Sequence, residues 1–397
     1  MLYTPGKTEC APADVDYSNE RLELLKNHFQ RLIDEKEIQC ATYCLSRGGK
    51  IFAGGAIGKK SFRENDDSPA LPDSIRRIAS VTKLFTAVAI MKLVEDGLVR
   101  LDNLVADVLP QFATPPYDQI NLFHLLTHTS GMHADSNCYP NKYQTGYWSL
   151  VDSAYKLHDP KKDSEFDWIA AALGTIGSGV CTKPGTEWAY NSFGYSLLGA
   201  IIEKLTGIHA HKYIEDKIAK PLKLKDTMFK IMPKTIDRYI ISDERTEEFL
   251  QDFKAGTIKK EPLWDKIPST GGGLQSTAYD MNRFGNMVIQ GGTLDGVRII
   301  GRKAAEKMTS RALFNIPNRC WGADEADRGY GIGFDMRDGP AFTFSPGTYS
   351  HEGAGACALY MDPKEELVAA WIVPFVGNEW YPKALFNVVN IIWSGLL

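Results

Sequence analysis

RRIASVTKLFTAVAIMKLVEDG, residues 76–97, combines an apolar helix with a lysine in its first turn. From Val81 to Val94 apolar residues occur on nearly every face, a pattern typical of a helix that is buried on most sides. We therefore expect Lys83 inside the protein. Burial disfavours the charge of this lysine, and the positive end of the helix dipole opposes it by about 0.3–1 kcal/mol.

Ser80 precedes Lys83 by three residues, a spacing that places both side chains on one helix face, about 5–6 Å apart at Cβ. An amine with a lowered pKa can take the proton of a serine hydroxyl, so this pair predicts a nucleophile with its base. A role of Ser80 as a helix N-cap stays open, although a capping box would place Glu or Gln at position 83. The same spacing recurs at Ser153 and Lys156, in a polar stretch where we expect the lysine to be solvated.

The composition excludes several classes of protein. A chain of 397 residues with 44% hydrophobic residues suggests two domains, or one large domain with an insertion. The net charge of -4 argues against a nucleic-acid binder, and no apolar run approaches the ~20 residues of a membrane helix. The N-terminus lacks the features of a secretory signal, and the 7 cysteines show no Cys-x-x-Cys spacing. We expect reduced thiols, a cytoplasmic location and no membrane insertion.

A zinc site is the competing interpretation of His124 and His128. The spacing of four residues suits zinc ligands on a helix, but the pair lacks the glutamate of His-Glu-x-x-His. We interpret the pair as part of a structural helix end, and we expect neither a metal nor a cofactor.

The order of elements predicts an α/β (α+β) fold. A charged helix near the N-terminus is followed by two strands joined at Gly49, and strands and a last amphipathic helix return after about residue 270. The intervening sequence is mostly helical, with turns at Pro115-Pro116 and 183–185. We expect residues 1–100 and 266–397 to form one domain, an antiparallel sheet flanked by helices, and residues 101–265 a mostly helical domain. The active site is expected in the cleft between them.

Two further stretches carry candidate partners for Ser80. In CTKPGTEWAYNSFGYSLLGAIIEKLTG, Tyr190 lies on a loop ahead of an amphipathic helix that begins at Phe193, where its hydroxyl can face a cleft; a packed core tyrosine is the alternative. In YSHEGAGACALYMDP, small residues from Ala354 to Ala358 follow His351-Glu352-Gly353, and backbone N–H groups there can join that of Ser80 in an oxyanion hole.

Ser80-Val81-Thr82-Lys83, Tyr190-Asn191-Ser192 and His351-Glu352-Gly353, in this order, resemble the three motifs of the serine β-lactamase and penicillin-binding-protein superfamily. Because the second motif contains a tyrosine, the sequence is most similar to class C β-lactamases, D-peptidases and family VIII carboxylesterases within this superfamily. LLTHTSGM (125–132) and STGGGLQSTAYDMNRFGNMVIQGG (269–292) also resemble this family, and the likeness extends from about residue 22 to the C-terminus.

The resemblance implies a role for each motif. Ser80 would be the acylated nucleophile, Lys83 its proton acceptor, and Tyr190 the group that passes a proton to the leaving group and activates the deacylating water. The N–H groups of Ser80 and Ala354 would form the oxyanion hole. The residues expected to bind substrate are Gly353, which would keep the strand edge open, with His351, Asn191 and Ser192.

The sequence departs from the family pattern at two places. The second motif of the family ends in Asn, but here Ser192 is third and Asn191 stands one place early, a departure that argues against recognition of a substrate amide. The third motif has His351 where β-lactamases have a lysine, which lowers the side-chain pKa from about 10.4 to about 6.5. At neutral pH this substitution removes most of the positive charge that would hold a β-lactam carboxylate.

These features predict a serine hydrolase that forms an acyl-enzyme on small esters, a carboxylesterase. The alternatives are a β-lactamase or a D-amino-acid peptidase or amidase, and a non-catalytic binding protein with the same fold. The partner is expected to be a small ester or amide, for which Tyr143, Tyr147 and Trp148 are candidate pocket residues, with core packing as the alternative. The sequence does not indicate the oligomeric state.

Overall fold

A six-stranded antiparallel sheet forms one side of the molecule in the computed structural model. The structure describes residues 2–135, 138, 147–158, 166–175, 180–258, 262–337, 339–354, 357–377 and 381–397. The strand order β1-β3-β2-β10-β9-β8 joins strands from both halves of the chain. Their bounds are β1 Tyr3–Pro5, β2 Cys40–Arg47, β3 Lys50–Gly58, β8 Tyr349–Gly353, β9 Cys357–Asp362 and β10 Leu367–Ile372.

The β2–β3 hairpin turns at Gly48 and Gly49, whose φ angles of 55° and 79° lie in the left-handed region that glycine adopts without strain. In β2, Ala41, Tyr43 and Leu45 alternate with residues that face the opposite side of the sheet. Because β2, β9 and β10 bury both of their faces, these strands carry apolar or small residues at nearly every position.

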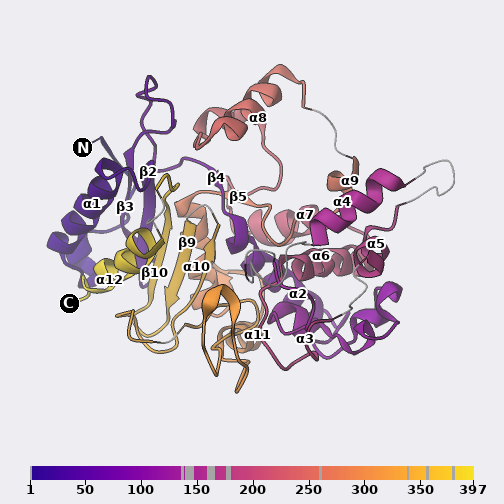
Figure 1. The fold of residues 1–397 in the computed structure, drawn as a ribbon. Coiled ribbons are helices and arrows are strands. Elements are labelled where there is room, and N and C mark those ends of the chain that lie inside the picture. The colour runs from indigo at the N-terminus through magenta and orange to yellow at the C-terminus, as the bar shows by residue number, and fades with distance from the viewer. Residues whose placement is uncertain are drawn as a thin grey trace.

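Helices cover both faces of this sheet (Figure 1). One face packs against α1 (Asn19–Asp34) and α12 (Asn387–Trp393), in a core that includes Phe29, Tyr43 and Trp371. The other face packs against α10 (Ala278–Ile289), where the Phe284 ring stacks on Phe85 from the next layer. The expected α/β class, an antiparallel sheet flanked by helices and built from both ends of the chain, is thereby confirmed.

A group of helices occupies the right-hand side of Figure 1, beyond α10. Its central pair is α2 (Thr82–Glu95) and α6 (Ser192–Thr206), which pack against each other. The other α-helices in the described residues are α3 (Leu122–Leu126), α4 (Tyr147–Leu157), α5 (Trp168–Thr175), α7 (Ala210–Ile214), α8 (Glu244–Ala255), α9 (Pro262–Lys266) and α11 (Arg302–Thr309).

The position of α2 bears on the expected domain boundaries. This helix lies within residues 1–100, but it packs against α6 and α7 from the stretch expected to be helical. One continuous buried cluster runs from the sheet face through α10 to α2 and α6. The division at residues 100 and 266 therefore stays a prediction.

The sequence GYGIGFDM, residues 329–336, resembles a strand but forms a tight turn with single bridges at Tyr330 and Asp335. Gly333 has a φ of 84°, and a side chain there would collide with Ala87 on α2. The glycines therefore serve a turn and a close approach to the helix, and the apolar residues between them pack without forming a ladder.

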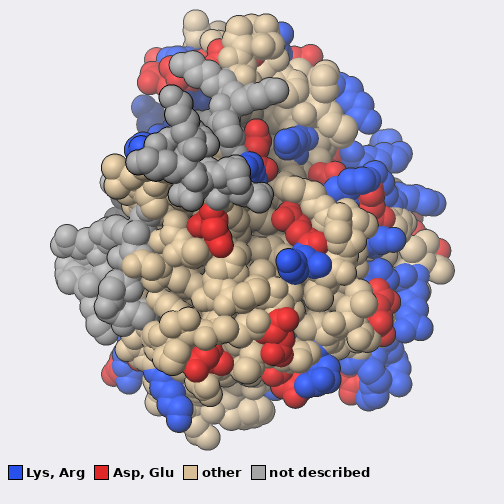
Figure 2. All heavy atoms as spheres, turned by 90° about the vertical axis from the view of Figure 1, so that its right-hand side faces the viewer, with Lys and Arg blue, Asp and Glu red and all other residues tan. Residues whose placement is uncertain are grey.

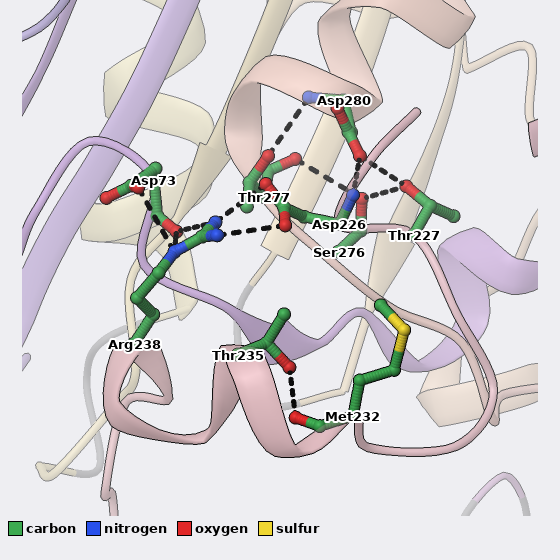
Figure 3. A network of polar contacts seen from close by, with 9 residues as sticks. All are labelled: Asp73, Asp226, Thr227, Met232, Thr235, Arg238, Ser276, Thr277 and Asp280. Carbon is green, nitrogen blue, oxygen red and sulfur yellow. Dashed lines mark hydrogen bonds and ion pairs between the residues drawn. The ribbon is translucent and has the colours of Figure 1, made fainter. Parts of the chain in front are cut away.

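A short ribbon, β4 (Arg76–Arg77) paired with β5 (Gln275–Ser276), leads into the Ser80 segment. Figure 3 shows the polar network behind β5. Asp280 at the start of α10 accepts hydrogen bonds from the Asp226 backbone N–H (2.8 Å) and the Thr227 hydroxyl (3.0 Å), and that hydroxyl also lies 2.8 Å from the Ser276 hydroxyl. Burial raises the pKa of Asp280 to about 6. These bonds tie β5 to α10, so β4 has a fixed partner.

The face on the right of Figure 1 is drawn in Figure 2. Most of its described atoms belong to uncharged residues, and acidic and basic side chains are interspersed, with Lys and Arg gathered toward one edge. Among the residues that the structure describes, no helix has both the length and the apolar character that crossing a bilayer requires.

Candidate active site

Ser80 lies in a 3-10 turn, Ala79–Val81, immediately before α2. The N-cap position of α2 is Val81, so the Ser80 side chain does not act as the cap. Ala79 has a φ of 43°, in the left-handed region, which costs about 1–3 kcal/mol for a residue other than glycine. The serine hydroxyl is thus free for other partners, and a strained residue precedes it.

Residues 272–274 hold this turn in place. The Ile78 N–H donates to the Leu274 carbonyl at 2.9 Å, and the Leu274 N–H donates to the Thr82 hydroxyl at 3.1 Å. Arg77 Nε donates to the Gly272 carbonyl at 2.7 Å. Residues before and after Ser80 are therefore hydrogen-bonded to the same neighbouring segment. These hydrogen bonds offset the conformational strain at Ala79.

Lys83 is 0% exposed, as the apolar pattern of its helix predicts. Its Nζ lies 3.1 Å from Ser80 Oγ, 3.1 Å from Ser192 Oγ and 2.7 Å from the Gly271 carbonyl oxygen. Burial lowers the pKa of Lys83 to about 8, against the attraction of the Asp135 carboxylate. An appreciable fraction of this amine is therefore neutral at pH 7 to 8 and can accept a proton from Ser80.

Tyr190, on the loop before α6, lies beside Ser80 and Lys83. Its side chain is hydrogen-bonded to that of Ser80, and the Lys83 Nζ lies 4.7 Å from its ring centroid. Burial raises the pKa of Tyr190 well above its ordinary value, so the phenol keeps its proton. The arrangement suits a proton donor.

The two residues after Tyr190 have separate roles in the structure. Asn191 is the N-cap of α6: its Oδ1 accepts the Gly194 N–H at 2.7 Å, and its Nδ2 donates to the His133 carbonyl at 2.6 Å. Both ends of the Asn191 amide are used in these bonds, and the residue does not line the cavity at Ser80. The cap fixes the start of α6 and places Ser192 beside Lys83.

Sequence analysis missed two groups in this cluster, Asp135 and the Gly271 carbonyl. Asp135 accepts the Ser192 N–H at 2.8 Å and the Ser192 hydroxyl at 2.6 Å. Neither group lies near Lys83 in sequence, and a backbone carbonyl leaves no sequence signal. The acid could be found only by knowing that the 129–135 loop folds against the start of α6.

The third motif lies on β8, at the edge of the sheet and next to the Ser80 turn. A Cβ on Gly353 would lie 2.3 Å from the Ile78 carbonyl oxygen, so only glycine fits here without a shift of the backbone. Cys357 on β9 donates its thiol to the same carbonyl at 3.0 Å. Ala354 follows β8 in an exposed turn, and nothing is described of the two residues after it.

His351 is buried, with its ring centroid 6.4 Å from that of Tyr190. Burial, aided by the charge of Lys83, lowers the pKa of His351 to about 4. Its Nδ1 lies 2.7 Å from the Glu352 carbonyl oxygen, which requires a proton on that nitrogen. At neutral pH His351 is therefore uncharged, with Nε2 as an acceptor.

A cavity of about 520 Å³ opens at Ser80. Tyr147 and Trp148 on α4 line it, as does Phe193, which stacks on the Tyr147 ring at 4.4 Å. Tyr143, the third expected pocket residue, lies outside the described residues. The remaining lining residues come from four separate stretches between residues 77 and 272: Arg77, Ala79, Ala134, Asp135, Ser192, Ser196, Ile267, Ser269, Gly271 and Gly272.

The two histidines considered as zinc ligands make backbone hydrogen bonds. His124 Nδ1 accepts the Asn121 N–H at 3.3 Å, and His128 Nδ1 accepts the Asn191 N–H at 3.1 Å. His128 also packs its ring against Tyr190, with centroids 4.4 Å apart. His128 therefore supports the loop that carries Tyr190, whereas His124 completes the capping box at the start of α3.

Comparison with known proteins gives the family. Residues 25–384 match the family described as Beta-lactamase, well over half of the chain. The chain belongs to the Beta-lactamase family. Membership indicates serine hydrolase activity in general, in agreement with the resemblance of the three motifs.

Relatives of this Beta-lactamase family member have different names. A protein of Salmonella heidelberg (strain SL476), named "Putative D-alanyl-D-alanine carboxypeptidase", is 26% identical over 99% of this chain and 91% of its own length. A penicillin-binding protein homolog from Caulobacter crescentus has a TM-score of 0.72 at 18% identity, over 98% of this chain and all (100%) of that chain. A family VIII carboxylesterase has a TM-score of 0.69 at 18% identity, also over 98% and 100%. The two structures show that the fold is shared.

Proposed function

We propose that this protein is a carboxylesterase that cleaves small esters through an acyl-enzyme on Ser80. The observation that supports it best is the buried Lys83 amine, 3.1 Å from the Ser80 hydroxyl and with its pKa lowered to about 8 by burial. Burial of an unpaired lysine is unfavourable for stability, because the charged form loses its hydration. The presence of such a lysine beside a serine hydroxyl therefore favours a role as a catalytic base.

In the proposed acylation step, Ser80 Oγ attacks the ester carbonyl carbon while its proton passes to Lys83. The carbonyl oxygen becomes an oxyanion, which the N–H groups of Ser80 and Ala354 would stabilise. When the tetrahedral intermediate collapses, the bond to the alcohol oxygen breaks, and Tyr190 supplies the proton that this oxygen needs. Tyr190 regains a proton from Lys83, so the amine is neutral again.

Deacylation repeats the same steps with water in place of the alcohol. Water attacks the acyl carbon and gives its proton to Tyr190, which passes its own proton to the neutral Lys83. When the tetrahedral intermediate collapses, the bond to Ser80 Oγ breaks, Lys83 returns the proton to this oxygen, and the carboxylic acid is released. An ester requires only the nucleophile, the oxyanion hole and an apolar pocket. Tyr147, Trp148 and Phe193 offer such a pocket wall.

The preference for esters over β-lactams rests on His351. A charge-assisted hydrogen bond to a β-lactam carboxylate would contribute roughly 1.5–3 kcal/mol. With the pKa of His351 lowered to about 4, this residue carries no such charge at neutral pH. The buried Asn191 side chain offers no contact to a substrate amide either.

A D-amino-acid peptidase is the second candidate. The Salmonella relative has a carboxypeptidase name, and Arg77 lines the cavity with a guanidinium that can receive a carboxylate. A β-lactamase with the same chemistry is a further alternative. A non-catalytic binding protein is disfavoured, because the serine, the lysine and the tyrosine lie in mutual contact.

Hydrolysis rates on short-chain p-nitrophenyl esters, benzylpenicillin, nitrocefin and D-alanyl peptides test these alternatives. We expect kcat/KM on the best ester to exceed that on any penicillin by at least about 100-fold, or ~2.7 kcal/mol in transition-state binding. Comparable efficiency on a D-alanyl peptide would favour the second candidate, and comparable efficiency on a β-lactam would favour the β-lactamase. If a fluorophosphonate fails to attach to Ser80, the binding protein becomes the better interpretation.

A further inference from the structure

The three hydrogen bonds of Lys83 differ in what they allow the amine to do. The Gly271 carbonyl oxygen, 2.7 Å away, can only accept, so the amine must donate one N–H to it. Ser192 and Ser80, both at 3.1 Å, are hydroxyls that can either donate or accept. The orientation of these two hydroxyls therefore decides where the lone pair of the neutral amine points.

Asp135 removes the choice at Ser192. Its carboxylate accepts the Ser192 hydroxyl at 2.6 Å and holds the same residue through the backbone N–H at 2.8 Å. A hydroxyl has one proton, and an ionised carboxylate only accepts. Ser192 Oγ can therefore only accept from Lys83.

A neutral amine has two N–H groups, and the Gly271 carbonyl and Ser192 use both. The third position around the nitrogen, directed at Ser80 Oγ, is then the lone pair. Tyr190 keeps its proton and can donate it to Ser80, which leaves the Ser80 hydroxyl proton for the amine. The bonds form one directed chain, from Tyr190 through Ser80, Lys83 and Ser192 to Asp135.

We propose that Asp135 is a positioning residue that, through Ser192, directs the lone pair of Lys83 at the hydroxyl of Ser80. The inference rests on the proposed function, because it assigns Lys83 the role of base. It adds that the serine in the third place of the second motif acts together with an acid supplied by another loop. An amide at position 135 could donate to Ser192, which would release the serine proton toward the amine and leave the lone pair without a fixed direction.

The charge of Asp135 raises the pKa of Lys83, opposite to the effect of burial. The positioning role of Asp135 can therefore be measured through the pH dependence of the reaction. Its negative charge favours the protonated amine, whereas burial and Arg77 disfavour it. Among the described residues, the other groups that face the amine are the Tyr190 and Tyr195 rings, the Cys138 thiol, and the neutral His128 and His351. Removal of the charge at position 135 should lower the pKa of Lys83, whereas a merely loosened site would admit water and raise that pKa toward its ordinary value.

The experiment measures the rate of Ser80 labelling by a fluorophosphonate from pH 5 to 10, in the wild type, D135N, S192A and the control D152N. The control acid pairs with Lys156 on α4, and neither residue lines the cavity at Ser80. For D135N we expect a plateau lower by about 10- to 100-fold and a midpoint shifted to lower pH. For S192A we expect a similar loss of plateau without that shift, and for D152N the wild-type profile.

A wild-type plateau in D135N, or a midpoint shifted to higher pH, would overturn the proposal while leaving the proposed function intact. If D135N does not fold, as judged by circular dichroism, S192A decides: a wild-type plateau in S192A overturns the proposal. The failure of the proposed function looks different, because the wild type itself would then show no label on Ser80.

Discussion

The chain contains the Ser-x-x-Lys spacing twice, and the two copies have become different structures. Ser80 and Lys83 lie at the start of a helix with a buried lysine, whereas Ser153 and Lys156 lie on α4 with a lysine side chain that is 72% exposed. Lys156 forms an ion pair with Asp152 at 2.6 Å, and Ser153 donates to the Ser149 carbonyl at 2.8 Å. The spacing brings a hydroxyl and an amine to one helix face in both copies, but only the first copy is covered by other segments of the chain.

This difference shows what converts a pair of side chains into a candidate site. The second copy satisfies its hydrogen bonds within one helix, so nothing aligns the amine with the hydroxyl. The first copy receives Tyr190, Ser192 and Gly271 from two distant segments. These segments exclude water, and the exclusion of water lowers the pKa of the amine.

The largest expected effect separates the two serines. Replacement of Ser80 by Ala should lower ester hydrolysis by about 10⁴-fold or more, because the nucleophile is lost, whereas Ser153→Ala should leave the rate unchanged. Steady-state rates on p-nitrophenyl butyrate, with circular dichroism to verify the fold, measure both. Near wild-type hydrolysis by the Ser80 variant would contradict the assignment.

The second largest effect is the pH dependence of acylation, which is set by Lys83. Only neutral Lys83 can accept a proton, and its pKa is about 8. The acylation rate should therefore rise about tenfold per pH unit below pH 8 and level off above it. Pre-steady-state acylation between pH 5 and 10 measures this profile. A rate that still climbs through pH 10 would mean that Lys83 keeps the proton and another group is the base.

A third prediction concerns Asn191, the N-cap of α6, which places Ser192 beside Lys83 of the first copy. Asn191→Ala removes two buried hydrogen bonds at the start of α6 and should lower the free energy of unfolding by about 1–3 kcal/mol. The ratio of ester to anilide hydrolysis should not change, since this side chain does not line the cavity. Urea denaturation measures the change in stability, and the rates of ester and anilide hydrolysis give the ratio. A selective loss of anilide hydrolysis without loss of stability would instead place Asn191 in contact with the substrate.

The smallest effect belongs to the second lysine. Lys156→Ala removes an exposed ion pair with Asp152, for which we expect about 0.3–0.5 kcal/mol of stability and no change in hydrolysis. Thermal unfolding at low and high salt measures this contribution. A loss of activity in this variant would mean that the two copies are less different than their surroundings indicate.

Local pattern was sufficient for several elements. The charged helix near the N-terminus, the hairpin at Gly49 and the burial of Lys83 each follow from periodicity or from a turn residue, and each is confirmed. The expectation that strands return after about residue 270 fails at 329–336, because the apolar residues of this glycine-rich stretch pack around a tight turn. The role of Asn191 as a cap was missed, although an Asn one place before a helix is a common start signal.

The sequence by itself determined the α/β class, the family likeness and the pairing of Ser80 with Lys83, because these depend on spacing and on the apolar pattern within single elements. Only the tertiary structure decided which hydrogen bonds Lys83 makes, that Asp135 reaches Ser192, and that burial lowers the pKa of His351 to about 4. The physical reason is that pKa values and hydrogen-bond directions depend on distances and on water exclusion. Both are set by segments that lie as far apart in sequence as Ser80, Ser192 and His351.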